Sequence, residues 1–452
     1  MSEANTVIPL REHQEPDTRE PRRFKVFTAR QLDKIEQLQR LDEDARFAMR
    51  VVANVLPFRV NEYVIEELID WDKVPDDPIY QLTFPQKGML APEHFDKVAE
   101  AMRGGDKAEI DAAVAEVREA LNPHPAGQME HNIPEVDGEK VEGIQHKYNE
   151  TVLFFPSQGQ VCHSYCTFCF RWAQFIGDND LKIATKEAGQ LKRYVQAHPE
   201  ITDILITGGD PLVMKTRNLR AHIEPLLELE QIRTIRIGSK ALTFWPQRVI
   251  SDKDADDLLD LFREVQAAGK HLALMAHYNH WRELEPAIAR EAIARVRETG
   301  AQIRAQGPLL AHINDNADDW ARLWQTQVEL GIVPYYMFVE RDTGARRYFE
   351  VPLARAWHIY REAMKQVSGL ARTARGPSMS SHPGKVEIQG VTEVAGEKVF
   401  VLRLIQGRNP DWVQRPFFAK YNEDATWLNH LEPAFGEEKF FFDDELADME
   451  GE

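Results

Sequence analysis

The stretch VLFFPSQGQVCHSYCTFC, residues 152–169, joins a strand-like run to a compact set of cysteines. Its first half is apolar and rich in Phe, as in a buried strand. Its second half holds Cys162, Cys166 and Cys169 in the spacing C-x3-C-x2-C, and the chain has 3 cysteines in all. An odd, clustered set is a poor disulfide framework, so this set indicates metal binding.

Downstream of this stretch, short apolar runs alternate with amphipathic stretches. The runs with strand character are 151–156, 203–207, 234–238, 271–276, 301–305 and 333–338, and the stretches with helical spacing are 186–197, 219–229, 252–268, 283–299, 318–330 and 353–366. This alternation predicts an α/β fold with a parallel sheet, and a partial (β/α)6, TIM-like barrel is favoured over an open doubly wound sheet. In such a barrel the loops after the strands build the active site, and the cysteines lie in the first of them.

The rest of the chain divides into further expected parts. Residues 1–23 are expected to be flexible, and 24–145 to form a helical extension with helices at 29–56, 92–103 and 107–121. A Pro- and Gly-rich loop at 122–143 marks the boundary with the barrel, which takes residues 146–370. Residues 371–452 contain a hairpin, in which VEIQGV and KVFVLRLIQ flank VAGE, and an acidic tail.

Composition excludes several classes of protein. The formal net charge of −18 argues against a nucleic-acid-binding surface, because phosphates require clustered Lys and Arg. No apolar run approaches the roughly 18 residues that a membrane span needs. The N-terminal sequence lacks the apolar core of a secretory signal, so a cytoplasmic location is expected.

Three thiolates on a short loop can hold three irons of a [4Fe–4S] cluster. The fourth iron then keeps an open position at which a small molecule can bind and react, as at catalytic metal sites. Two structural alternatives compete with this interpretation: a zinc site with His163 as the fourth ligand, and three unrelated core cysteines. Structural zinc sites usually use two separated ligand pairs, so the cluster is the favoured interpretation.

The same motif, with Phe168 before the last cysteine, resembles the signature of the radical S-adenosylmethionine (SAM) superfamily. The surrounding sequence is similar to the lysine 2,3-aminomutase family. The similar segments occur in the same order as in that family and are HKYNETVLF, LITGGDPLV, RIGSKALTFWPQR, AHYNH and VPYYMF. The resemblance covers most of residues 45–390. It implies that the open iron binds SAM, that reduction yields a 5′-deoxyadenosyl radical, and that pyridoxal 5′-phosphate (PLP) is a second cofactor.

The resemblance also implies a set of SAM-binding residues at the strand ends. They are Phe168, Gly208, Gly209, Asp210, Ser239, His277, Asn279 and Gln306. Glycines let the backbone approach a ligand closely, and the carbonyls or Asp210 could face an ammonium group. Each has an ordinary structural interpretation as well: GGDP alone is usually a turn, and Ser239 could cap a helix.

Two basic residues are expected to act on the substrate. In the family, an arginine at the position of Arg171 grips the α-carboxylate, for which a planar guanidinium is well shaped. The alternative is a solvated loop arginine. Lys385, in SSHPGKVEI, is the expected PLP anchor, because an amine can form an imine with an aldehyde. That segment departs from the Gly-rich form of the family, and Thr151 stands where the family often has a basic residue, although Lys147 keeps a positive charge nearby.

The distal end of the expected pocket departs from the lysine-specific pattern. Lysine-specific members place two aspartates against the distal ammonium of the substrate, and alignment puts Arg341 and Ser378 at those positions. Asp342 is one residue further, so a shift of register would restore one acid. Because a positive charge repels an ammonium, an acidic amino acid such as glutamate is the expected substrate. The C-terminal cysteines that bind structural zinc in many members are absent, so an oligomer would be held differently.

The leading hypothesis is an isomerase: a radical SAM, PLP-dependent amino-acid 2,3-aminomutase in which Arg171 and Lys385 have the catalytic roles. The expected partners are a small-molecule amino acid, an electron donor such as flavodoxin or ferredoxin, and further copies of the chain. The alternatives are a lysine 2,3-aminomutase acting on free or protein-bound lysine, a radical SAM enzyme without PLP, and a non-catalytic iron–sulfur protein. The GGDP and HYNH motifs count against the last, because a carrier needs no SAM pocket.

Overall fold

The computed structural model describes residues 21–125, 132–136, 139–177, 183–185 and 188–451. Its centre is an 11-stranded sheet whose strands follow one another in chain order, from β5 (Ile144–Tyr148) to β15 (Pro416–Lys420). The strands from β6 (Thr151–Phe154) to β12 (Arg375–Ser380) are parallel, and those at both ends are antiparallel. The expected flexible N-terminus lies mostly outside the described residues.

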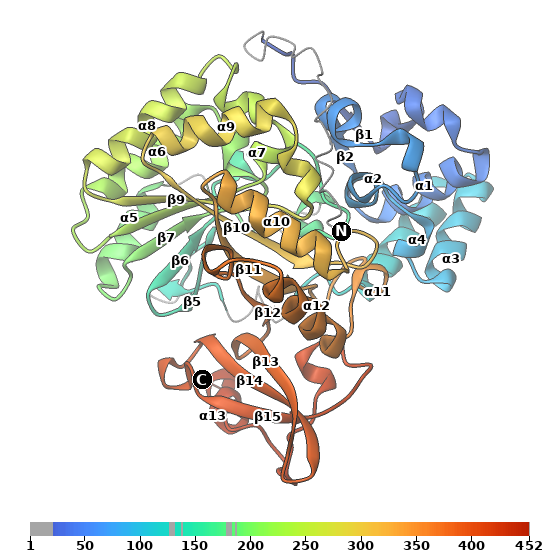
Figure 1. Cartoon of the computed structure of the whole chain (residues 1–452). Coiled ribbons are helices and arrows are strands. Elements are labelled where there is room, and N and C mark those ends of the chain that lie inside the picture. The colour runs from blue at the N-terminus through green and yellow to red at the C-terminus, as the bar shows by residue number, and fades with distance from the viewer. Residues whose placement is uncertain (1–20, 126–131, 137–138, 178–182, 186–187, 452) are drawn as a thin grey trace, which may run out of the picture.

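Six strands of the parallel part match the predicted runs. They are β6, β7 (Asp203–Ile206), β8 (Thr234–Ser239), β9 (His271–His277), β10 (Gln302–Leu309) and β11 (Val333–Val339). The helices between them are α5 (Ala188–Ala197), α6 (Thr216–Leu227), α8 (Ala255–Ala267), α9 (Ala287–Glu298), α10 (Ala317–Glu329) and α12 (Leu353–Lys365), and they lie along one side of the sheet (Figure 1). A doubly wound sheet would reverse its strand order and have helices on both faces. The structure therefore confirms the α/β, partial-barrel prediction.

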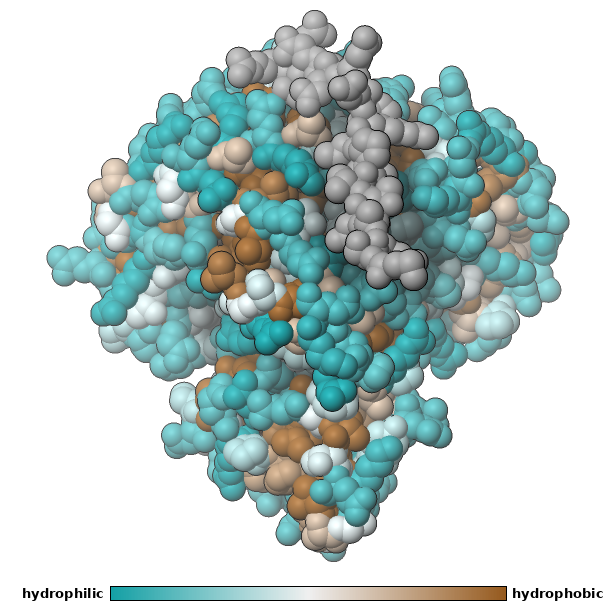
Figure 2. Space-filling view, in the orientation of Figure 1, coloured by the Kyte–Doolittle hydropathy of each residue, from teal (hydrophilic) through white to brown (hydrophobic). Residues whose placement is uncertain are grey.

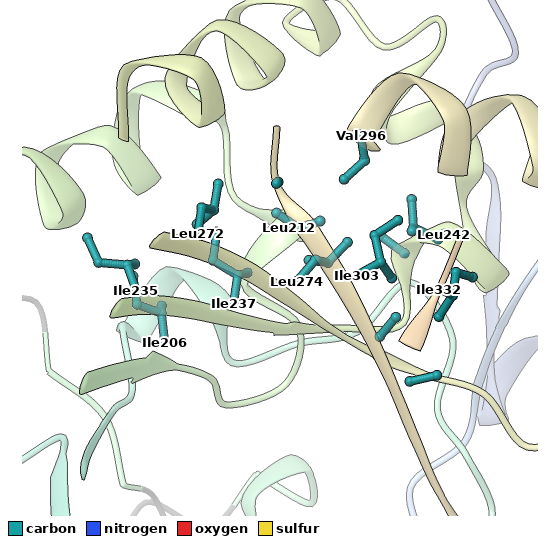
Figure 3. Close-up of a cluster of buried hydrophobic side chains, with 14 of the residues drawn as sticks. Ile206, Leu212, Ile235, Ile237, Leu242, Leu272, Leu274, Val296, Ile303 and Ile332 are labelled. Atoms are coloured by element: carbon teal, nitrogen blue, oxygen red, sulfur yellow. The ribbon is translucent and has the colours of Figure 1, made fainter. Parts of the chain in front are cut away.

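Alternation within the strands separates a core from a cavity. In β8, Ile235 and Ile237 are buried, whereas Arg236 and Gly238, which follow them in turn, are partly exposed. Figure 3 shows Ile235, Ile237 and Leu274 in the hydrophobic core that the strands share with the helices. The opposite face of the strands lines a hollow, so the period-two pattern of the sequence marks the active-site side of the barrel.

The N-terminal extension corrects one prediction. The single helix expected at 29–56 is three elements: the 3₁₀ turns Ala29–Lys34 and Glu36–Arg40, and α1 (Glu43–Val55). The Asp42 side chain accepts from the Ala45 amide, so α1 begins there rather than continuing from the preceding turn. The helices α3 (Pro92–Gly104) and α4 (Lys107–Ala120) agree with the prediction.

The C-terminal part extends the same sheet. Strands β13 (Gly384–Val394) and β14 (Glu397–Gly407) form the predicted hairpin, with Ala395 and Gly396 at positive φ in the turn. Because β12 pairs with both β11 and β13, the sheet crosses the expected boundary at residue 370 without interruption. The four-part division stays a prediction.

The surface is mixed in character. Hydrophilic residues predominate on the face shown in Figure 2, and hydrophobic residues form small groups on it. Within the described part of the chain, no helix combines the length and the apolar character required to cross a membrane.

Candidate active site

One cavity of about 370 Å³ opens at the carboxyl ends of the parallel strands. All three cysteines line it, together with Arg171 and Lys385. The predicted residues Phe168, Gly208, Gly209, Asp210, Ser239, His277, Gln306 and Arg341 line it as well. Segments more than 200 residues apart in the sequence thus face a common space.

The cysteine loop is held in place by the N-terminal extension. The Tyr165 amide donates to the Arg59 carbonyl at 2.8 Å, and the Thr167 amide donates to the Leu82 carbonyl at 2.9 Å. Asn61 is fully buried; its backbone amide donates to the Ser164 hydroxyl and its side-chain amide to the Phe244 carbonyl. These bonds fix the residues between the cysteines, so the extension is part of the site.

The arrangement of the thiols fits a multi-iron cluster. Cys162, Cys166 and Cys169 face the cavity without a disulfide among them. No three His, Cys, Asp or Glu side chains among the described residues are grouped so as to hold one metal ion. A cubane cluster takes one thiolate per iron, so three thiols that face one space can serve three of its irons without meeting at a single ion.

Burial dominates the protonation of the thiols. It raises the pKa of Cys169 to about 11 and raises the pKa of Cys162 well above its ordinary value. Bound iron would stabilise the thiolates, because metal binding releases the protons of its ligands.

The GGDP loop packs directly against the start of the cysteine loop. Gly208 has φ +140°, and a Cβ on Gly209 would lie 2.5 Å from the Val161 nitrogen. The Asp210 amide donates to the Val161 carbonyl at 2.9 Å. The glycines are therefore needed for contact between two loops, and only glycine allows this approach.

Asp210 does not offer a free carboxylate to a ligand. It is buried, and it accepts from the Ser239 hydroxyl at 2.8 Å, the Lys240 amide at 2.9 Å and the Leu212 amide at 2.9 Å. The hypothesis that this carboxylate faces an ammonium is therefore not supported by its geometry. Burial raises the pKa of Asp210, and its hydrogen bonds oppose that shift.

Two other predicted residues lie off the cavity wall. Asn279 is fully buried, with its side-chain oxygen bound by Lys240. Ser378 is fully buried on β12, with its hydroxyl 3.5 Å from the Met337 carbonyl. Ser378 is not among the residues that line the cavity, whereas Ser380, two residues further along the strand, is, and the contact of Ser378 with substrate stays a prediction.

Arg171 is buried but has no hydrogen-bond partner for its guanidinium among the described side chains. It is 9% exposed and lies 4.4 Å from the ring centre of Phe155 and 5.2 Å from that of Phe170. Burial lowers the pKa of Arg171 to about 10, so the group stays charged at neutral pH. An unsatisfied buried cation that faces a cavity fits an anionic ligand, and the solvated-loop alternative is wrong.

Lys385 lies at the start of β13, deep in the same cavity. Its amine donates to the Gln406 side chain at 3.0 Å and lies 4.3 Å from the ring centre of Tyr336. Burial, assisted by Arg236 and Arg375, lowers the pKa of Lys385 to about 7. A large neutral fraction makes this amine a nucleophile, which fits attachment of an aldehyde cofactor.

Sequence reasoning missed Glu340, which lies between β11 and Arg341. It lines the cavity, is 5% exposed, and its Oε1 has no partner in the described part of the chain. Asp342 turns away and pairs with Arg346, so a register shift does not bring it to the pocket. The sequence feature that could have identified Glu340 as a site residue is its position at the carboxyl end of a predicted parallel strand.

Arg341 and Arg171 are tied together through their neighbours. The Trp172 indole donates to the Thr343 hydroxyl at 2.8 Å, and the Asn122 side chain donates to the Asp342 carbonyl at 2.6 Å. Both guanidinium groups lie near the ring of Phe170, at 5.2 Å for Arg171 and 4.8 Å for Arg341. The segments that carry the two cations are thus joined directly by Trp172 and Thr343, and Asn122 of the N-terminal extension also contacts the second segment.

Comparison with known proteins agrees with this site. A putative L-lysine 2,3-aminomutase of Aquifex aeolicus is 32% identical over 392 residues, which cover 87% of this chain and 92% of that protein. The L-lysine 2,3-aminomutase of Escherichia coli is 29% identical over 55% of this chain and 69% of its own length. That of Bacillus subtilis is 24% identical, with coverages of 84% and 71%. No protein-family model matches the chain.

A partial barrel with three cysteines after its first strand defines a radical SAM enzyme. The chain belongs to the lysine 2,3-aminomutase family. It is accordingly an isomerase of the aminomutase type that uses a [4Fe–4S] cluster and SAM.

Proposed function

We propose that the chain is a PLP-dependent 2,3-aminomutase acting on a free amino acid, with L-lysine as the leading substrate. The observation that carries the proposal is the single cavity shared by the three cysteines, Arg171 and Lys385. The cluster and SAM would supply a radical that removes a hydrogen, and PLP would supply the carbonyl that carries the migrating nitrogen. The names of the relatives favour lysine and give the expected acidic substrate no support.

Arg171 binds the α-carboxylate in this proposal. No acid among the described residues is paired with its guanidinium, which lies beside the rings of Phe155 and Phe170. Two parallel hydrogen bonds would then fix the orientation of the substrate backbone relative to the cysteines.

Lys385 holds PLP, and Gln406 positions its amine. The geometry supports this role because the amine lies in the cavity and is neutral in a large fraction of molecules at pH 7. The aromatic rings of Tyr336 and Phe338 lie beside the amine and shield it from solvent.

Glu340 receives the distal ammonium of lysine. Burial raises the pKa of this carboxyl well above its ordinary value and the charge of Arg341 opposes the shift only in part, so a second cation would favour the ionised form. A lysine ammonium would satisfy the unpartnered Oε1, so Glu340 would take the place of the aspartates that are exchanged for Arg341 and Ser378 in this sequence.

Arg341 favours a second candidate, an acidic amino acid. Its Nε is buried without a hydrogen-bond partner in the described structure, and it lines the same cavity. A substrate carboxylate would satisfy this guanidinium, whereas lysine would leave it unpaired.

Product analysis on reconstituted, reduced protein separates the two candidates. We expect β-lysine from lysine, a loss of about 10–100-fold in kcat/KM for Glu340→Gln, and little loss for Arg341→Gln, since a charged hydrogen bond contributes about 1.5–3 kcal/mol. Turnover of glutamate without lysine, lost in Arg341→Gln, would establish the second candidate. Cleavage of SAM with no amino-acid product would reject both.

We also propose that a small electron-transfer protein such as flavodoxin or ferredoxin reduces the cluster, and that the chain forms a homo-oligomer. With 3 cysteines in the sequence, all in the cluster motif, the chain has none left for a C-terminal zinc site. The residues after Gln406 are the candidate contact between copies.

A further inference from the structure

A buried polar network joins the carboxyl ends of four neighbouring strands, β7 to β10. Its centre is Lys240, which follows β8 and is 9% exposed. The Lys240 amine donates to the His277 carbonyl at 3.1 Å, to the Asn279 side-chain oxygen at 3.0 Å and to Glu283 at 2.6 Å. An ammonium group has three donors, so each one has an acceptor inside the network.

Glu283 completes the network on the side of β9. It is fully buried, and one of its oxygens binds Lys240. The other oxygen accepts from the backbone amides of Asn279 at 2.5 Å and His280 at 2.9 Å. This carboxylate therefore shapes the turn after β9 and attaches that turn to the loop after β8.

Two further side chains extend the network to the outer strands. Asp210, after β7, accepts from the Ser239 hydroxyl and the Lys240 amide. Asn314, after β10, donates to the Asn279 carbonyl at 2.8 Å and to the Pro308 carbonyl at 3.1 Å. The ion pair thus joins the loops after β8 and β9, and hydrogen bonds of Asp210 and Asn314 to the same two loops add those after β7 and β10.

Of the residues that the family resemblance assigns to SAM, all but Asn279 line the cavity. The side-chain oxygens of Asp210 and Asn279 are nevertheless occupied by Lys240 or its neighbours. Buried polar groups are used here to set loop positions, and a satisfied network of this kind is rigid.

We infer that Lys240 and Glu283 are positioning residues for SAM: their buried ion pair fixes the loops after β8 and β9 so that the cavity-facing groups are in place before SAM binds. The inference rests on SAM binding in this cavity and does not depend on the identity of the amino-acid substrate. Neither residue needs to touch the reacting atoms for this role.

The chain contains a matched control. Lys270 is also 9% exposed, and its amine donates to the Leu229 carbonyl at 2.8 Å, but it precedes β9 at the opposite end of the strand. Lys240→Met and Lys270→Met each remove one buried ammonium beside the same strand. Only the first change breaks the network at the cavity.

The test measures SAM binding rather than turnover. Reconstituted, reduced protein is titrated with SAM, and the change in the electron paramagnetic resonance spectrum of the cluster gives the dissociation constant. We expect Lys240→Met and Glu283→Gln to keep about four irons and to bind SAM about 10–100-fold more weakly, as when groups behind a binding site are removed. Lys270→Met should bind SAM as the unmodified protein does.

Lys240→Arg provides a second, milder variant that retains the charge. It should bind SAM more tightly than Lys240→Met, because its guanidinium can still donate to Glu283. Wild-type SAM affinity in Lys240→Met or Glu283→Gln would overturn the inference, as would equal weakening by Lys270→Met. If Lys240→Met does not fold, Glu283→Gln alone provides the test, and wild-type SAM affinity in that variant would overturn the inference. Failure to convert lysine with normal SAM affinity would count against the proposed function and not against this network.

Discussion

Lys385 illustrates how the cavity changes the chemistry of one side chain. Its amine lies beside Tyr336, Phe338 and Gln406, and no acid among the described residues is hydrogen-bonded to it. Desolvation disfavours the charged form, and the nearby Arg236 and Arg375 add repulsion. The same lysine on a surface would be almost entirely protonated at pH 7.

The pH dependence of PLP attachment follows from this shift. The neutral form of Lys385 predominates above a pKa of about 7, so the rate of attachment to apoprotein should rise with pH and reach half its maximum near pH 7. Stopped-flow absorbance of bound PLP measures this rate, with Lys385→Ala as the control without attachment. A half-maximum near pH 10 would show that the amine is not desolvated.

Arg171→Lys tests the grip on the α-carboxylate. Lysine keeps the charge but cannot form the two parallel hydrogen bonds of a guanidinium, so KM for the substrate should rise by about 10–100-fold. The cluster and its SAM affinity should be unchanged, because the cysteines and the network of Lys240 are untouched. Unchanged substrate kinetics in this variant would contradict the assignment.

Residue-level prediction from sequence succeeded where a motif has a fixed place on a strand end. The cysteines, Arg171 and Lys385 have such places and meet in one cavity. Ser378 does not line this cavity and Ser380 does, and a two-residue difference along β12 cannot be read from the sequence alone. Lys240 and Glu283 escaped notice, because a buried ion pair between distant loops has no local sequence pattern.

At the scale of elements, the loop after β9 joins the barrel to the N-terminal extension. Asp77 caps α2 (Pro78–Thr83) by accepting from the amides of Ile79 and Tyr80, and it pairs with Arg282. Asp77 is fully buried. One side chain thus caps a helix and connects two parts of the chain.

Asp77→Ala should therefore lower the free energy of unfolding by about 3–5 kcal/mol, because it removes a fully buried acid and leaves Arg282, whose side chain is 18% exposed, without its ion-pair partner. The exposed cap of α4 offers a control: Asp106 accepts from Ala108 and Glu109 but has no ion pair in the structure, so Asp106→Ala should cost about 1 kcal/mol. Denaturant unfolding measures the loss of stability in each variant. Equal losses for Asp77→Ala and Asp106→Ala would show that the ion pair with Arg282 contributes nothing to stability.

Elements with a clear period were predicted well, and those set by local capping were not. The six βα units follow from alternation that repeats along the chain. The break of the 29–56 region depends on Asp42, whose side chain competes with continuation of a helix. Strand β12 was not predicted, because RGPSMS contains Gly and Pro and forms only between β11 and β13.

At the scale of the whole molecule, three regions of sequence surround one cavity. The N-terminal extension holds the cysteine loop, the parallel strands supply the SAM side, and β13 brings Lys385 from beyond the barrel. Figure 1 shows these regions as the blue helices, the central sheet and the red strands. The account therefore predicts that radical formation and amino-acid binding occur in the same enclosed space.

Isotope transfer tests this coupling most directly. Reduced holoprotein is incubated with SAM, PLP and L-lysine that carries deuterium at carbon 3, and both SAM and the amino-acid product are analysed by mass spectrometry. The account predicts β-lysine together with deuterium in the 5′-methylene of SAM, because the hydrogen removed from substrate passes through the deoxyadenosyl group. Formation of β-lysine with no deuterium in SAM, or cleavage of SAM with lysine unchanged, would contradict it.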